Sequence, residues 1–138
     1  MAWVAVTEAY VVAAMPSEIR AKYDAWIVDP EKAGRLAAIL GSVLADFRTG
    51  LSANATVVMD SAVDTVPERC VQHVLTVIFY HLTLEMGLSV NMSAQTAFIN
   101  AETYLRQLYT SVAVLDREAA AGTPSYGEAA CRPARALM

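Results

Sequence analysis

Residues 66–87 are apolar in almost every direction around a helix, and this pattern predicts one central helix. Thr65 or Asp64 suits its cap, and Pro67 suits its first turn, where a missing N–H costs nothing. Gly87 suits the left-handed position at which many helices end. We expect other helices or other subunits to cover so apolar a helix. Its polar side chains follow one narrow stripe, which consists of Arg69, Gln72, Thr76, Tyr80 and Thr83.

Two short helices are expected near the start of the chain. Thr7 can cap the first of them, and Pro16 ends it. Ser17 can cap the second, over residues 18–26. We expect both to pack as a lid over the longer helices. The apolar contacts of the second are Ile19, Tyr23 and Trp26, at helical spacing.

A third helix is predicted from Asp29-Pro30-Glu31, which combines a cap, a proline in the first turn and a carboxylate at the positive end. We expect this helix to run to about Thr49, with Gly50 as its stop. Its core-facing side is apolar, and it comprises Leu36, Ile39, Leu40, Val43, Leu44 and Phe47.

A second face of the same helix carries only small residues. Gly34 and Gly41 lie on it, with Ala38 and Ala45 between and beyond them. A glycine inside a helix costs roughly 1 kcal/mol relative to alanine, so two on one face indicate the close approach of another backbone. That backbone belongs either to a neighbouring helix of the same chain or to another subunit.

Residues 50–66 have no helical period and predict a long irregular connection. Such connections are uncommon in compact domains and are usually functional or disordered. The β-branched character of residues 56–59 allows a short strand that pairs with the edge of a neighbour. We therefore place candidate contacts to a neighbouring subunit or ring at Thr56, Val57, Val58, Met59 and Asp60, together with Gly34 and Gly41.

A last amphipathic helix is expected from Ala94 to about Leu115, after a cap at Ser93, and it can extend to residue 121. Glu102 and Arg106 are spaced to form an ion pair on its outside. Residues 122–138 are rich in glycine, proline and alanine, so they predict an extended C-terminal arm. The organisation predicted is one helical domain over residues 1–121 and an arm over 122–138. The stripe on the last helix consists of Ala97, Ala101, Leu105, Leu108, Val112 and Leu115.

The composition supports an all-α fold, a small helical bundle that buries surface against partners. Of its 138 residues, 56% are hydrophobic and 17% charged, and the formal net charge is −4. The negative charge argues against tight binding of nucleic acid, although DNA can pass nearby without being gripped. No segment has the apolar length of a membrane span or the features of a signal peptide. Two cysteines, Cys70 and Cys131, predict free thiols in a reduced cytosolic product.

The residues that carry chemistry are few and scattered. His73 and His81 are eight residues apart on one helix, too far to share a metal ion. Cys70 and His73 offer two ligands, but nothing nearby in the sequence completes a site. His81 and Glu85 are spaced for a polar contact on the helix. We therefore expect no enzyme activity, no cofactor and no metal.

The order of the elements carries a resemblance to a known family. A short helix opens with Val6-Thr7-Glu8-Ala9-Tyr10-Val11, and a long helix ends in Asp46-Phe47-Arg48. A long loop precedes Val66-Pro67-Glu68, and the next helix carries Tyr80-His81-Leu82. Over residues 3–120 this arrangement resembles the head–tail connector adaptor (head-completion) proteins of tailed bacteriophages. The last helix departs from the family, because Asn100-Ala101-Glu102 stands where members often show a Tyr-Glu-Ala-like start.

The resemblance implies a structural role in the virion neck, reached after synthesis in the host cytoplasm. Members form a homo-oligomeric ring, usually a dodecamer, beneath the portal protein. The ring prolongs the DNA channel without specific DNA binding, involves no membrane, and docks the next neck protein, a stopper or tail-completion protein. The C-terminal arm commonly reaches the portal. The corresponding residues here are Tyr126, Arg132, Pro133, Arg135, Leu137 and Met138.

A function of another class fits the same surfaces. A small cytosolic helical module for protein interaction or regulation would also bury apolar faces against a partner, but it would need no ordered arm.

Overall fold

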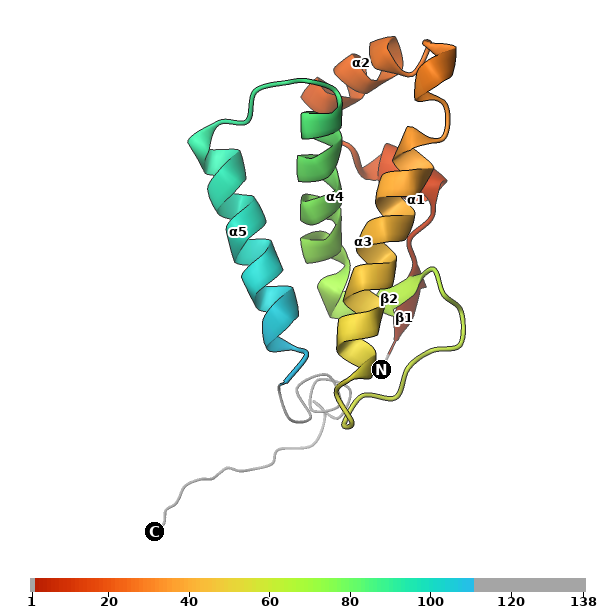
Figure 1. Ribbon diagram of the computed structural model, residues 1–138, viewed down its shortest axis with the longest axis vertical. Coiled ribbons are helices and arrows are strands. Elements are labelled where there is room, and N and C mark those ends of the chain that lie inside the picture. The colour runs from red at the N-terminus through yellow and green to blue at the C-terminus, as the bar shows by residue number, and fades with distance from the viewer. Residues whose placement is uncertain (1, 111–138) are drawn as a thin grey trace.

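The computed structural model describes residues 2–110, and they form a small helical bundle with one two-stranded sheet (Figure 1). This confirms the predicted all-α class and the long connection between helices, which covers residues 53–64. The predicted arm and the domain boundary at residue 121 lie outside the described residues. In chain order the elements are β1 (Trp3–Ala5), α1 (Glu8–Ala14), α2 (Ser17–Trp26), the 3-10 turn η1 (Pro30–Lys32), α3 (Arg35–Ser52), β2 (Thr65–Pro67), the 3-10 turn η2 (Glu68–Cys70), α4 (Val71–Glu85) and α5 (Met92–Gln107).

Helix α4 is central, as its apolar circumference predicts. It stands between α3 and α5, and α2 lies at the upper end of the bundle (Figure 1). Gly87 has a φ of +74° and follows the helix, so the predicted left-handed end is confirmed. The core is built from all the helices, and α4 supplies Val71, Val74, Leu75, Val77, Ile78 and Leu82.

The predicted start of the central helix is wrong. Thr65 and Pro67 belong to strand β2, which pairs antiparallel with β1 through Val4 opposite Val66. Pro67 has no N–H to donate to the ladder and therefore suits the end of the strand. The chain then turns through η2, and α4 begins at Val71.

The third helix begins later and ends later than predicted. Asp29 does act as a cap, since its carboxylate accepts from the backbone N–H of Glu31 at 3.0 Å, but it caps the short turn η1. Gly34 has a φ of +81° and separates η1 from α3, because glycine adopts this left-handed conformation at little cost. Gly50 is not a stop, and α3 continues to Ser52.

The small-residue face of α3 is exposed to solvent. Ala38, Gly41 and Ala45 are exposed, and a Cβ built at Gly41 meets no heavy atom within 4 Å. No helix among residues 2–110 covers this face, so within this part of the chain the neighbouring helix that was one of the two interpretations is not found. Gly34 is the residue before the helix rather than part of the face. The contact with another subunit stays a prediction.

The long connection has its partners within its own chain. The guanidinium of Arg48 on α3 donates to the carbonyl oxygens of Asp60 and Thr65, both at 2.6 Å, and to the Thr65 hydroxyl at 3.0 Å. The same guanidinium lies 5.5 Å from the centre of the Trp3 ring on β1. The expected strand over residues 56–59 does not form; the strand that does form is β2, at the end of the connection.

Two expected caps differ from the structure and one is confirmed. The Thr7 hydroxyl accepts from the N–H of Tyr10 at 3.2 Å, as predicted for α1. Pro16 rather than Ser17 precedes α2. Asn91 rather than Ser93 caps α5, by accepting from the N–H of residue 94 at 2.7 Å.

Candidate functional site

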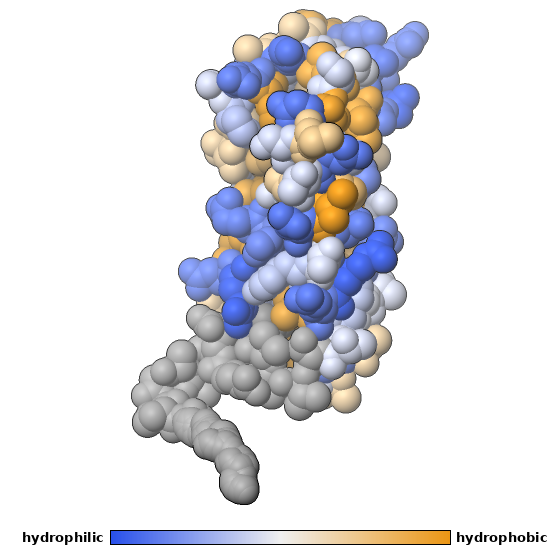
Figure 2. Space-filling view, turned by 90° about the vertical axis from the view of Figure 1, so that its left-hand side faces the viewer, coloured by the Kyte–Doolittle hydropathy of each residue, from blue (hydrophilic) through white to orange (hydrophobic). Residues whose placement is uncertain are grey.

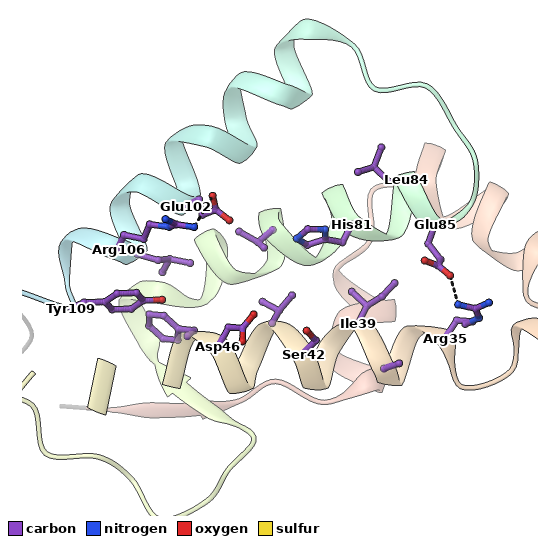
Figure 3. A pocket seen from close by; sticks show the side chains of 15 residues that line it. Arg35, Ile39, Ser42, Asp46, His81, Leu84, Glu85, Glu102, Arg106 and Tyr109 are labelled. Carbon is purple, nitrogen blue, oxygen red and sulfur yellow. Dashed lines mark hydrogen bonds and ion pairs between the residues drawn. The ribbon is translucent and has the colours of Figure 1, made fainter. Parts of the chain in front are cut away.

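A groove of about 540 Å³ runs between α3 and α5, with α4 along its floor (Figure 3). Side chains of the outer two helices face one another across it. Three helices far apart in sequence therefore create one concave surface. Its lining consists of Arg35, Ala38, Ile39, Ser42, Val43, Asp46, Phe47, Val77, His81, Leu84, Glu85, Glu102, Leu105, Arg106 and Tyr109.

The floor and one end of the groove are apolar. Val43, Val77 and Leu105 are almost fully buried and form the floor. Ile39 is partly buried, and Leu84 is 50% exposed although it belongs to the central helix. Exposed apolar surface at the rim of a groove is typical of a binding surface.

Charged side chains border this apolar strip. Arg35 and Glu85 form an ion pair of 2.6 Å at one end, and Arg106 and Glu102 form one of 3.5 Å nearer the other end (Figure 3). Asp46 makes no ion pair with any residue between 2 and 110. The groove therefore offers one carboxylate that is available for an incoming cation.

Tyr109 lies at the end of the groove near Asp46. Its ring lies against α3 over Gly50, where an added Cβ would overlap the ring, and its centre is 6.2 Å from that of Phe47. Burial, and then Asp46 and Glu102, raise the pKa of Tyr109 against the opposing effect of Arg106. The hydroxyl is therefore a neutral hydrogen-bonding group at the mouth of the groove.

Stacked rings hold α4 and α5 together beside the groove. His73 stacks on Tyr104 with ring centres 4.0 Å apart, and Tyr80 stacks on Phe98 at the same distance. The Arg69 side chain donates to the Tyr104 hydroxyl at 3.0 Å. Burial lowers the pKa of His73, so its imidazole is neutral at pH 7. These contacts fix the position of α5 and hence the width of the groove.

A second hollow of about 410 Å³ lies between α2, α4 and the start of α5. The hydroxyls of Thr76 and Thr83 face it, but each already donates to a backbone carbonyl of its own helix, at 2.9 and 2.8 Å. This hollow therefore offers a ligand fewer polar contacts than the groove does.

The view onto the α5 side shows hydrophobic residues interrupting a mostly hydrophilic surface (Figure 2). Met92 and Ile99 are the exposed hydrophobic residues of that helix, at 80% and 53%.

The structure does not gather the predicted contact residues into one site. Val57 and Met59 pack against the core, while Thr56 donates to the side chain of Asn54. The carbonyl oxygen of Asp60 accepts from Arg48, as described above, and its carboxylate accepts from the Thr65 hydroxyl at 2.8 Å. Val58, 77% exposed, is the one predicted loop residue that offers a large apolar surface. The arm residues Tyr126, Arg132, Pro133, Arg135, Leu137 and Met138 lie outside the described residues.

The residues that were considered as candidates for chemistry take part in core packing, ring contacts and ion pairs. Cys70 is fully buried, and desolvation raises the pKa of its thiol to about 12. The expected contact between His81 and Glu85 is not formed: His81 packs edge-on against Phe98, and Glu85 pairs with Arg35. Within residues 2–110 no three His, Cys, Asp or Glu side chains are grouped as metal ligands. No described helix is long and apolar enough to cross a membrane.

Comparisons with protein-family models, with curated proteins and with solved structures give no match to this chain. The site therefore rests on its geometry. Sequence reasoning missed the groove, because Leu84 lies outside the polar stripe of α4 and nothing in the sequence distinguishes it from a core residue, whereas in the structure it is half exposed.

Proposed function

We propose that this chain is a non-enzymatic structural adaptor of a tailed-bacteriophage neck. Copies of it form a homo-oligomeric ring beneath the portal protein, and the ring prolongs the DNA channel and docks the next neck protein. Its place is the neck of the virion, after synthesis in the host cytoplasm.

The observation that carries the proposal is the exposed small-residue face of α3 beside an apolar groove. Gly41 is inside the helix, yet no side chain of the described part occupies the space above it. Glycine there weakens the helix relative to alanine without improving the packing of the single chain. A second copy that approaches α3 closely would use this space.

The net charge supports the same role. At −4 the chain does not attract phosphates, and a channel wall of this sign lets DNA slide where a basic wall would hold it. The central, apolar α4 suits a building block that buries surface against partners.

The groove also favours the second candidate, a module that binds a helix or segment of a cytosolic partner. The two functions differ in copy number and location. Mass spectrometry of purified particles, with the copy number measured against the major capsid protein, tests them. Roughly a dozen copies per particle supports the adaptor, as expected from the family resemblance. Absence from mature particles contradicts it and favours the cytosolic module.

A variant pair tests the α3 face itself. Gly41→Leu places a large side chain on the proposed contact, so the ring should fail while the chain remains folded. Ala21→Leu adds the same side chain to an exposed position of α2 and serves as the control. Sedimentation velocity in the presence of the portal protein measures both. Ring formation by Gly41→Leu equal to that of the control would contradict the proposed interface.

A further inference from the structure

We propose that residues 132–138 of the same chain dock into the groove between α3 and α5 in the free protein. The sequence of this segment is Arg-Pro-Ala-Arg-Ala-Leu-Met, which carries two cationic, no acidic and two large apolar side chains. The inference concerns the isolated chain and does not depend on the adaptor function.

The charges of the groove and of the segment are complementary. The groove holds three carboxylates against two guanidinium groups, and Asp46 is the carboxylate that has no ion pair with a described residue. A guanidinium binds a carboxylate through two parallel hydrogen bonds, and such a pair gives both strength and orientation. Arg135 supplies that group, and Asp46 receives it.

The apolar side chains of the segment reach the apolar part of the groove when Arg135 lies at Asp46. Asp46 and Ile39 are seven residues apart on α3, which corresponds to about 10 Å along a helix. Arg135 and Met138 are three residues apart, which also gives about 10 Å in an extended chain. With Arg135 on Asp46, residues 137 and 138 therefore reach Ile39 and the half-exposed Leu84, beside the Arg35–Glu85 ion pair.

The connecting chain is long enough and leaves the bundle at the correct end. Tyr109 lines the groove near Asp46, and the described chain ends one residue later. Residues 111–131 then provide 21 residues, and a chain of that number of residues can reach at most about 70 Å. The groove extends about 18 Å along α3, from residue 35 to residue 47. The segment enters beside Tyr109 and runs toward Leu84, and its attachment gives it an effective concentration in the millimolar range.

The chain contains a suitable position for a probe. Cys131 directly precedes the segment, and Cys70 is buried with its thiol protonated, so a nitroxide reagent should react at Cys131. A Cys70→Ala variant removes any doubt about the labelled position. The ¹⁵N-labelled full chain carrying the nitroxide is diluted with unlabelled chain, so that contacts between copies do not contribute. The amide signals of Ser42 and Asp46 should then broaden strongly, and those of α1 should keep their intensity.

A charge reversal separates docking from chance proximity. Asp46→Arg should abolish the broadening in the groove, Arg135→Asp should do the same, and the double variant should restore it. Glu8→Arg reverses an exposed charge on α1 and serves as the control, which should leave the broadening unchanged. Amide chemical shifts of the core that match those of the parent chain report that each variant is folded.

Three results would overturn the inference. The first is absence of broadening in the groove, and the second is broadening centred on the hollow between α2 and α5. The third is broadening that appears only when the nitroxide is on an unlabelled copy mixed with a ¹⁵N-labelled one, which would assign the groove to a second copy.

Discussion

Arg48 connects three parts of the molecule that are distant in sequence, so its replacement is a sharp test of the fold. Its guanidinium makes three hydrogen bonds to the connection and to β2, two of them of 2.6 Å to the carbonyl oxygens of Asp60 and Thr65. It also faces the ring of Trp3 on β1. Arg48→Met keeps the length of the apolar stem and removes all of these contacts.

The expected loss is about 3 kcal/mol in the free energy of unfolding. A hydrogen bond to a charged group contributes roughly 1.5–3 kcal/mol, but three bonds from one side chain are not additive and this side chain is only partly buried. The Thr65 carbonyl belongs to a buried residue and would lose a partner, which adds to the cost. Arg48→Lys should recover only part of the lost free energy of unfolding, because a compact ammonium cannot make the paired hydrogen bonds of the guanidinium.

Urea denaturation followed by circular dichroism measures the loss as a shift of the midpoint at constant slope. Arg106→Met is the matched control: its ion pair with Glu102 is exposed, so we expect a loss below about 0.5 kcal/mol. If Arg48→Met cost no more than this control, the connection would not be held through Arg48, and the reasoning would be refuted.

Gly41→Ala should raise the free energy of unfolding by up to about 1 kcal/mol, because alanine has the higher helix propensity and the added methyl meets no other atom. Gly50→Ala on the same helix should be clearly less stable than Gly41→Ala by urea denaturation, because its methyl displaces the ring of Tyr109; equal stability would contradict that packing. Burial lowers the folded pKa of His73 below its usual 6.5, so the unfolded chain takes up the proton first and stability is lost as the pH falls below 6.5. His73→Gln should lose that part of the pH dependence in denaturation curves recorded between about pH 7 and 5, and an unchanged profile would contradict it. Alkylation of Cys70, followed by peptide mass spectrometry, should require unfolding, and rapid modification of the native chain would show that the thiol is accessible.

Local chemistry explains which parts of the fold could be predicted from sequence. Thr7 caps α1 and Gly87 ends α4 because hydrogen bonding and backbone freedom within a few residues decide both positions. Gly34 shows the limit of such reasoning, because the sequence pattern is the same whether this glycine lies inside a helix or in a left-handed break before it. The packing of α3 on the core decides between these two conformations of Gly34. The strand at Thr65–Pro67 was hidden for a related reason, because its partner β1 lies about 60 residues earlier in the chain.

The groove could not be predicted at all from single segments. Asp46 has the sequence surroundings of any solvated carboxylate, and it becomes distinctive only when α3 and α5 stand on either side of α4. Ala38, Gly41 and Ala45 of the predicted small face do lie on α3, but Gly34 precedes the helix, and the exposure of the face depends on how the other helices pack. Sequence reasoning expected Glu85 to contact its own helix, whereas its cation comes from Arg35, 50 residues away.

The pairing of β1 with β2 has a consequence for synthesis in the cell. Trp3–Ala5 leaves the ribosome before its partner Thr65–Pro67, which is made about 60 residues later. At roughly 5–20 residues per second the first strand waits for several seconds. During this time its edge and the neighbouring Val6, fully buried in the finished fold, are uncovered. The nascent chain is therefore most vulnerable to association with other chains before α4 is complete, and closing the sheet ends that interval.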